Sequence, residues 1–570
     1  MKSLFKRLTI LAIPFMVLGC TNPNTSESSQ GSTASSSGKN PTSSSVSSSA
    51  STISSSQLPA YEAKLPQIKI AFDKNGANAN FATVATKSDL SRPKVDCNVT
   101  VTNCADNFKL DAVAGTIKVR GNQTAGWRKK GFKIKFSSSA SMLGLNKGRK
   151  YKEWVLLADA KDTTLIRTAA GLYLSKMVIS EGDKVWTSDY TPVTVYLNDE
   201  YWGLYYLAEQ KEVKTGRVQL DTPQDNYEGV DIGYCFELDH YADSAGAPDE
   251  ASEVRKGKDG DPTFRMRYSP EMAQGRPSGP LATGQVCTYT MLSDITDGPT
   301  TEHVQADYSS VNSQSGVPNS NATKTSNSNQ LSFIRDRMEA LYQVLYYAAI
   351  GERKNNQTVK KAKEITADNQ VIDSSKSIQE VIEQNFNLNA WVDGFIINAV
   401  SVPPDLGYSS FYMSFDNTPN GDHKLRYDVP WDFDSNFANR NNFYVNAQGD
   451  TYVENTYNTW LYMLSKLSFF VDMVKTKWNS LRDAKAFEGM LQMMQTFWTE
   501  NDGEIRKNHE RWPENDAASM EYNNFDEIRE PFKDPAQYKT AETETYNWVA
   551  KRVNFLESKW GKNRVNINTI

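Results

Sequence analysis

Between about residues 65 and 240 apolar and polar residues alternate with the period of two that is typical of half-buried strands. The clearest runs are residues 67–72, 115–120 and 132–136. Two further runs, residues 192–196 and 202–207, flank Asn198-Asp199, a dipeptide that favours the tight turn of a β-hairpin. This part of the chain is therefore predicted to be rich in strands.

Apolar residues at helical spacing mark other segments. Residues 163–176 follow the helix-start signal Asp162-Thr163-Thr164. In the second half, helical periodicity runs through residues 333–350, 378–400, 460–493 and 542–560. The pattern predicts an α+β fold with a β-rich part over residues 59–240, a mainly helical part over 331–500 and a helical extension over 501–570.

Two segments are too polar to form a core. Residues 241–330 are rich in Gly, Asp, Ser, Asn and Pro, which predicts a long, partly disordered surface insertion. Residues 20–58 are dominated by Ser and hold almost no apolar side chain, so they are predicted to be a flexible linker.

The first nineteen residues read as an export signal. Basic residues precede the apolar stretch 8–17, which is too short to span a bilayer. The stretch closes with Val17-Leu18-Gly19-Cys20, which resembles the lipobox of bacterial lipoproteins and implies lipidation of Cys20. An ordinary secretory signal with an incidental Cys is the alternative. A lipid anchor predicts an exported protein held in the cell envelope, at the outer membrane or the cell surface, with the membrane as a partner.

The net charge and the Cys and His residues bear on three questions: nucleic-acid binding, metal binding and disulfide pairing. The net charge of −5 gives no reason to propose a nucleic-acid partner. The four His lie scattered and no Cys-x-x-Cys occurs, so a metal site built from Cys and His is not predicted. In an oxidising exterior the simplest of three connectivities pairs Cys97 with Cys104 and Cys235 with Cys287.

The densest polar cluster is the run 426–437, where acidic and amide side chains lie among aromatic residues. Carboxylates in such surroundings are costly unless they bind something. On an extended segment Asp432 and Asp434 would point the same way, and two oxygen ligands so placed suit Mg²⁺. An Asx-turn that caps a buried strand is the alternative. A second candidate, Asp405, lies in a loop just upstream, where a general base would sit, although Pro-Asp is also a common turn.

Several ordered blocks together resemble the spore-coat CotH kinase family. They are Arg120-Gly121-Asn122, the Lys-rich strand 129–136, residues 154–158 with Asp162 and Arg167, the hairpin 195–205 leading to Glu209-Gln210, residues 233–239, and Pro430-Trp431-Asp432-Phe433-Asp434. The resemblance covers about residues 115–240 and 380–440.

This resemblance implies an atypical, secreted protein-kinase-like fold, with a β-rich N-lobe and a mainly helical C-lobe, that binds ATP and Mg²⁺ and phosphorylates extracellular or surface proteins. Asp405 would accept the proton of the substrate hydroxyl, and Asp432, with or without Asp434, would hold the metal.

The same resemblance suggests a nucleotide site in the first half of the chain. Lys133 or Lys135 is the candidate for the cation that contacts phosphate, and Arg120 and Asn122 would lie near the nucleotide. Glu209 is the candidate for an organising partner. A solvated strand face is the alternative for each basic residue.

One departure bears on activity. Kinase catalytic loops carry an Asn five residues after the catalytic Asp, and this chain has Ser410 there. Ser is a weaker metal ligand, which leaves open a non-catalytic adhesin or scaffold with the same fold. A glycoside hydrolase that pairs Asp405 with Asp432 is a third alternative.

Overall fold

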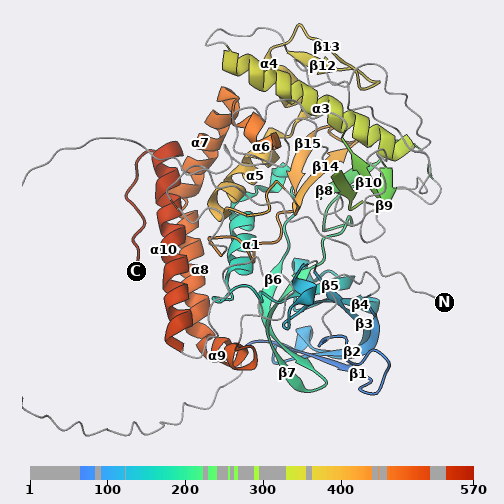
Figure 1. The fold of residues 1–570 in the computed structure, drawn as a ribbon, viewed down its shortest axis with the longest axis vertical. Coiled ribbons are helices and arrows are strands. Elements are labelled where there is room, and N and C mark those ends of the chain that lie inside the picture. Colours follow the sequence, from blue (N-terminus) through green and yellow to red (C-terminus); the bar gives the residue numbers. More distant parts are fainter. Residues whose placement is uncertain are drawn as a thin grey trace, which may run out of the picture. The chain divides into compact units, whose positions relative to one another are not determined.

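The alternating runs of the first half form strands in the computed structural model of the chain (Figure 1). The structure describes residues 64–83, 92–121, 123–221, 227, 229–239, 254–256, 262–266, 288–293, 329–354, 362–407, 409–439, 447, 459–513 and 535–570. The predicted export signal, the Ser-rich linker with Cys20, and Asn122 lie outside these residues.

A closed barrel is built from seven of the described strands. They are β1 (Gln67–Phe72), β2 (Val95–Thr102), β3 (Leu110–Arg120), β4 (Gly131–Ala140), β5 (Tyr151–Leu157), β6 (Tyr190–Leu197) and β7 (Glu200–Glu209). Their order is β1-β2-β3-β4-β5-β7-β6, and parallel pairing of β1 with β6 closes the ring. Alternate residues such as Phe132, Ile134 and Phe136 are buried in one core, as the period of two predicts.

The hairpin prediction is confirmed by β6 and β7. Asn198 and Asp199 have φ values of 49° and 67°, which is the left-handed backbone that a two-residue hairpin turn requires. Strands β6 and β7 pair antiparallel on either side of this turn. The Asn198 side chain also accepts a hydrogen bond from the backbone N–H of Phe72 at 2.8 Å, which fixes the turn against β1.

The helix predicted over residues 163–176 begins later, because α1 spans Arg167–Val178. Leu165 has a left-handed φ of 53°, so the chain cannot be helical there. The Asp162 carboxylate instead accepts hydrogen bonds from the backbone N–H groups of Ile166 at 2.8 Å and Arg167 at 2.7 Å. The Asp162 side chain, which lies outside the helix, therefore accepts hydrogen bonds from backbone N–H groups at the helix start that have no partner within the helix.

A second sheet combines strands from both halves of the chain. It consists of β8 (Gly233–Leu238), β9 (Val254–Lys256), β10 (Pro262–Arg265), β11 (Thr288–Met291), β14 (Phe411–Asp416) and β15 (Leu425–Asp428), in the order β15-β14-β8-β11-β10-β9. A separate pair is formed by β12 (Lys363–Ile365) and β13 (Val371–Asp373). Strand β8 pairs with β14 on one side and with β11 on the other.

The described parts of the predicted insertion 241–330 include strands β9, β10 and β11, which extend the sheet, and the first two residues of α3. These strands form although the segment is polar, because they carry apolar side chains that pack in the core. Phe264 and Tyr289 are fully buried, and their ring centroids lie 5.1 Å apart in a stacked arrangement. The Tyr289 hydroxyl also accepts a hydrogen bond from the Trp460 indole at 3.1 Å, which ties the sheet to the helical half.

Helices make up most of the remaining described chain. They are α3 (Asn329–Lys354), α4 (Ile378–Asn385), α5 (Leu388–Ser401), α6 (Thr459–Leu464), α7 (Ser468–Asp483), α8 (Ala486–Glu500), α9 (Asp502–Arg511) and α10 (Pro535–Trp560), with short 3-10 turns at Asp106–Phe108, Gln123–Gly126, Asn146–Gly148 and Glu181–Asp183. The helix predicted over 378–400 is divided into α4 and α5, because the Asn387 side chain accepts from the Ala390 N–H and starts a new helix. The α+β class is confirmed.

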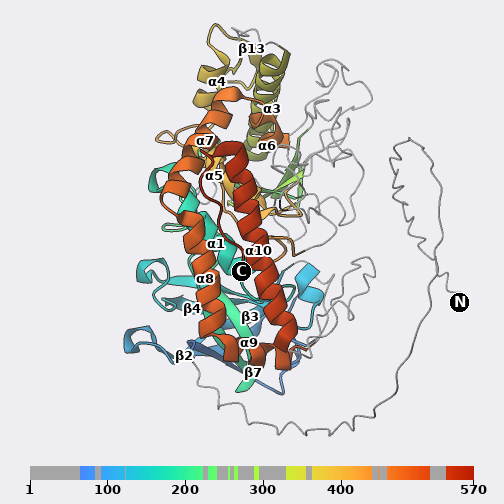
Figure 2. The ribbon, with the colours of Figure 1, turned by 90° about the vertical axis from the view of Figure 1, so that its left-hand side faces the viewer.

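The C-terminal helix belongs to the main core. Helices α8 and α10 lie side by side in both views (Figures 1 and 2), and α10 also contacts α5 and α7. Val549, Val553 and Leu556 of α10 are fully buried in the same apolar cluster as α5. No helix among the described residues is both long enough and apolar enough to cross a bilayer.

The predicted disulfide between Cys97 and Cys104 is wrong, because both residues carry free thiols. Residues 97–102 run along the extended strand β2, and each residue of a strand advances the chain by about 3.3 Å, so the two Cα atoms lie too far apart for a disulfide. Cys235 is also a free, buried thiol, and its predicted partner Cys287 lies outside the described residues.

A buried acid on α5 gives the fold a pH dependence. Asp393 is fully buried and its carboxylate lies 2.9 Å from Lys477 Nζ. Burial raises the pKa of Asp393 to about 8, the nearby Asp183 carboxylate acts in the same direction, and Lys477 opposes the shift. An unfolded Asp has a pKa near 3.9, so between about pH 4 and pH 8 the folded protein keeps a proton that the unfolded chain releases.

We therefore expect the free energy of unfolding to fall as the pH rises through this window. Asp393→Asn, which stays neutral at every pH, should flatten the dependence and make the protein more stable than wild type at pH 9, by on the order of a few kcal/mol. Urea unfolding at pH 5, 7 and 9 measures this. Asp472→Asn, at an exposed position of α7, is the control, and parallel curves for wild type and Asp393→Asn would refute the assignment.

Candidate active site

An acidic turn directly follows β15 and carries Asp432 and Asp434. The φ of Asp432 is 65°, so the extended conformation assumed for this segment is wrong, and the two carboxylates make different contacts. Asp432 is exposed, and its Oδ2 accepts a hydrogen bond from Ser410 Oγ at 3.1 Å. Asp434 is half-buried, with its Oδ1 at 3.8 Å from Lys161 Nζ. Asp432 is therefore the carboxylate that opens toward solvent.

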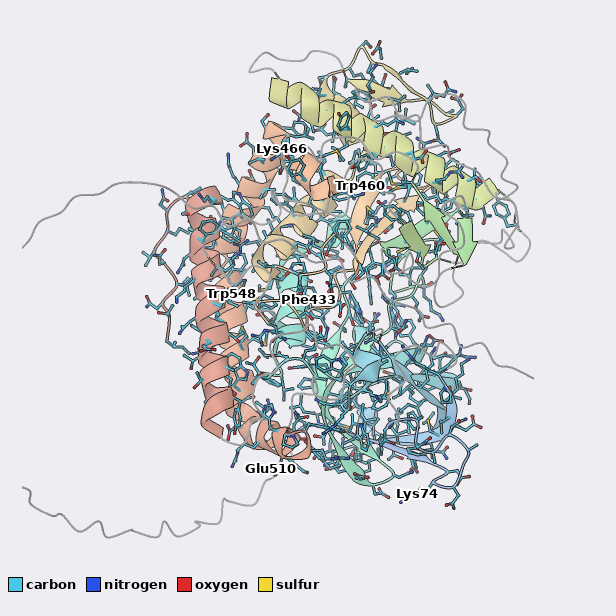
Figure 3. All side chains as sticks on the ribbon, viewed as in Figure 1. Lys74, Phe433, Trp460, Lys466, Glu510 and Trp548 are labelled. Carbon is cyan, nitrogen blue, oxygen red and sulfur yellow. The ribbon has the colours of Figure 1, made fainter. Side chains whose placement is uncertain are left out.

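Phe433, between these two acids, anchors the acidic turn on α1 (Figure 3). Its side chain is only 4 % exposed and packs where α1 has Gly171. A Cβ on Gly171 would lie 2.0 Å from Phe433 Cγ, which is far inside van der Waals contact. The absence of a side chain at residue 171 thus allows the aromatic ring to hold Asp432 and Asp434 in place.

The loop with Asp405 begins at the end of α5. Val402 caps the helix with a left-handed φ of 52°, and two prolines follow it. The backbone carbonyl of Asp405 accepts a hydrogen bond from the Ser409 N–H at 3.0 Å, so the loop is closed on itself. A bond of 2.7 Å from the Phe437 N–H to the Ser401 carbonyl joins this end of α5 to the acidic turn. Two segments that carry predicted site residues are thus held together.

A pocket lies where these two segments meet. Asp405, Ser410 and Asp432 all line it, together with residues from the end of α5 and the end of β15. Its volume of about 20 Å³ is enough for one water molecule or one ion. The structure therefore brings together the predicted base, the predicted metal ligand and Ser410.

Arg120 approaches the acidic turn from the barrel, at the last position of β3. Its guanidinium lies over the ring of Trp431, with 5.7 Å between the guanidinium carbon and the ring centroid. Burial lowers the pKa of Arg120, while Asp432 and Asp434 act in the opposite direction. The structure thus places this predicted nucleotide-site residue beside the acids.

A chain of polar contacts that the sequence analysis did not identify leads from β8 to the pocket. Glu237 Oε1 accepts a hydrogen bond from the Ser410 N–H at 2.8 Å. Its Oε2 accepts from the Tyr412 hydroxyl and from Lys211 Nζ, the latter at 3.3 Å. Burial raises the pKa of Glu237, and Lys211 opposes this shift. Because Ser410 in turn bonds Asp432, the carboxylate of Glu237 fixes the residue that contacts the exposed acid.

The sequence did carry a signal for Glu237. It is an acidic residue inside the otherwise apolar strand Tyr234-Cys235-Phe236-Glu237-Leu238, within a block that resembles the family. Such a residue needs a partner when the strand is buried. Which partner it takes depends on the pairing of β8 with β14, which the sequence pattern does not show.

The predicted phosphate-contacting lysines lie elsewhere on the barrel. Lys133 and Lys135 both pair with Glu153, the latter at 3.0 Å. Glu209 accepts hydrogen bonds from Arg217 Nε at 3.2 Å and from the Asp189 N–H at 2.9 Å. None of the contacts described for these three predicted residues reaches Asp405 or Asp432. Among the described residues, Arg120 and Lys161 are cations that lie beside the acidic turn.

The donor set of the pocket fits a hard cation better than a soft one. Among the described residues no three His, Cys, Asp or Glu gather closely enough to hold a metal ion. The pocket instead offers oxygen atoms of several kinds: the Asp432 carboxylate, the Ser410 hydroxyl and the side-chain amide of Asn436. Mg²⁺ binds one or two carboxylates and completes its shell with other oxygens, which matches this set.

Comparison with known proteins agrees with the family resemblance. Residues 117–263 match the family model described as CotH kinase protein, which confirms the resemblance over this segment. No curated protein matches the chain. The matched segment includes Arg120 and Glu237 and ends before Asp405 and Asp432.

Proposed function

We propose, from the CotH kinase match over residues 117–263 and the pocket that joins Asp405 to Asp432, that this protein is an atypical protein kinase. In this proposal it uses ATP and Mg²⁺ to phosphorylate hydroxyl groups of extracellular or cell-surface proteins. The pocket carries the proposal, because phosphoryl transfer requires a base and a metal-holding acid close to one phosphate. The barrel would act as the N-lobe and the helical half as the C-lobe.

The proposed location follows from the N-terminal segment. Lipidation of Cys20 would anchor the mature chain in the cell envelope, and the Ser-rich residues 20–58 would tether the catalytic part to it. A substrate protein on the same surface would then meet the pocket at a high local concentration.

The roles of the residues follow from their positions. Asp405 would accept the proton of the substrate hydroxyl, and Asp432 would hold the metal. Mg²⁺ held there would supply positive charge that neutralises the phosphate oxygens. Arg120 and Lys161, beside the acidic turn, would add positive charge where negative charge develops. Glu237 would act as a positioning residue, because it fixes the backbone of Ser410.

A non-catalytic adhesin or scaffold is the second candidate. Ser410 stands where kinases carry a metal-binding Asn, and its hydroxyl already donates to Asp432. In that case the pocket would not bind a nucleotide and the protein would act through its surface alone.

Calorimetric titration of the purified full chain with ATP, with and without Mg²⁺, tests the proposal. We expect binding that strengthens at least about tenfold with Mg²⁺, and we expect Asp432→Ala to remove this gain. Glu153→Gln is the matched control, because Glu153 pairs with Lys133 and Lys135 on the outer face of the barrel. A folded wild type that does not bind ATP would favour the scaffold.

A further inference from the structure

Asn436 has a buried amide that no group among the described residues satisfies. The residue is 1 % exposed and lines the pocket, yet neither Oδ1 nor Nδ2 has a hydrogen-bond partner within the described parts of the chain. Its backbone is fixed, since its N–H donates to the Phe433 carbonyl at 3.0 Å and its carbonyl accepts from the Asn439 N–H at 3.1 Å. A buried amide without partners destabilises a fold, so this position is costly unless a ligand completes it.

We infer that the amide oxygen of Asn436 is a ligand of a divalent cation held with Asp432 in this pocket. The inference rests on the proposed function and adds a residue to the same site. Asn436 follows Asp432 by four residues in one turn, and both line the same pocket. An amide oxygen beside a carboxylate and a hydroxyl is the donor chemistry that Mg²⁺ and Mn²⁺ accept.

The second Asn that lines the pocket has a hydrogen bond to the protein. Asn398 lies on α5, and its Nδ2 donates to the Gly394 carbonyl at 2.7 Å. Of the two Asn residues in the pocket walls, Asn436 is the one for which neither amide atom has a hydrogen-bond partner within the described ranges.

With this assignment, Ser410 has a different role from that of the metal-binding Asn of kinases. Kinase catalytic loops supply an amide oxygen to the metal from the position that Ser410 occupies. Here the amide comes from the acidic turn, and Ser410 instead links Asp432 to Glu237. The substitution at residue 410 therefore moves the amide ligand to another segment and does not remove it from the site.

Mn²⁺ alone, titrated into the full chain and followed by the electron paramagnetic resonance signal of the free ion, tests the inference without any measurement of activity. Asn436→Ala should weaken Mn²⁺ binding at least about tenfold. Asn436→Asp, which keeps an oxygen donor, should retain it. The melting temperature of metal-free Asn436→Ala should not fall below that of wild type, because the variant removes an unsatisfied buried amide.

Ser401→Ala is the matched control. Ser401 is fully buried at the end of α5, its Oγ also lacks a partner among the described residues, and it does not line the pocket. This variant should leave Mn²⁺ binding unchanged. Unchanged Mn²⁺ affinity in Asn436→Ala, or loss of binding in Asn436→Asp, would overturn the inference.

The outcomes also separate this inference from the kinase proposal. Wild type that binds Mn²⁺ through Asp432 and Asn436 but does not bind ATP would support the cation site and contradict the kinase. Binding of Mg²⁺ and ATP that is equally tight in wild type and in Asn436→Ala would leave the kinase proposal in place and exclude Asn436 as a ligand.

Discussion

Replacing Asp405 by Asn should lower the rate of phosphoryl transfer by roughly a hundredfold to ten-thousandfold, while the affinity for ATP and Mg²⁺ stays close to that of wild type. An amide has nearly the shape of a carboxylate but cannot accept the proton of an attacking hydroxyl. Asp405 lies in the pocket on the loop after α5, whereas the proposed metal ligand Asp432 comes from a separate turn. Loss of the base should therefore leave the binding of nucleotide and metal intact.

The rate is measured as phosphate that enters an added Ser-rich acceptor from labelled ATP, and the affinity by calorimetry on the same sample. Asp416→Asn is a control for the chemical change, because Asp416 ends β14 and its carboxylate accepts from Thr418 in a turn. An Asp405→Asn variant that transfers phosphate as fast as wild type would assign the base to another residue.

A methyl group added at residue 171 should disturb both the fold and the site. Ala is a better helix former than Gly by about 1 kcal/mol, so Gly171→Ala would stabilise α1 if helix propensity alone mattered. The new Cβ would instead collide with the ring of Phe433, at 2.0 Å from its Cγ. Overpacking of this kind costs about 1–3 kcal/mol, and relief requires the acidic turn to move. We expect lower stability and weaker Mg²⁺-dependent ATP binding together.

Urea unfolding and calorimetry measure the two effects. Gly182→Ala is the matched control, because a Cβ there would meet no atom within 4 Å, and it should change stability by a few tenths of a kcal/mol or less. Equal stability of Gly171→Ala and wild type would show that Phe433 does not pack against α1 in this way.

Local sequence signals were sufficient for the elements whose ends are set by nearby residues. Asn198-Asp199 identified the hairpin because the turn depends on the backbone of those two residues. The start of α1 was predicted too early, because Asp162 caps the helix across a left-handed Leu165, which periodicity does not reveal. The strands of the segment 241–330 were missed because they are short runs within a very polar stretch.

Site residues could be predicted from the sequence where they belong to one short motif. They could not be predicted where their role depends on contacts between distant segments. Asp405 and Asp432 each stood out in a local motif, and the pocket brings both together. Glu237 was missed because its partner Ser410 lies 173 residues further along the chain. Asn436 was missed because what distinguishes it is an unsatisfied buried amide, which depends on the packing of several segments.

The place of β8 between β11 and β14 also has a consequence for how the chain is made. Glu237 of β8 leaves the ribosome 173 residues before Ser410, at the entrance to β14. At a synthesis rate of about 5–20 residues per second, the edge of β8 that pairs with β14 waits roughly nine to thirty-five seconds for that strand. An unpaired strand edge can pair with other chains, so protection of this nascent edge until β14 arrives is a requirement for a good yield of folded protein.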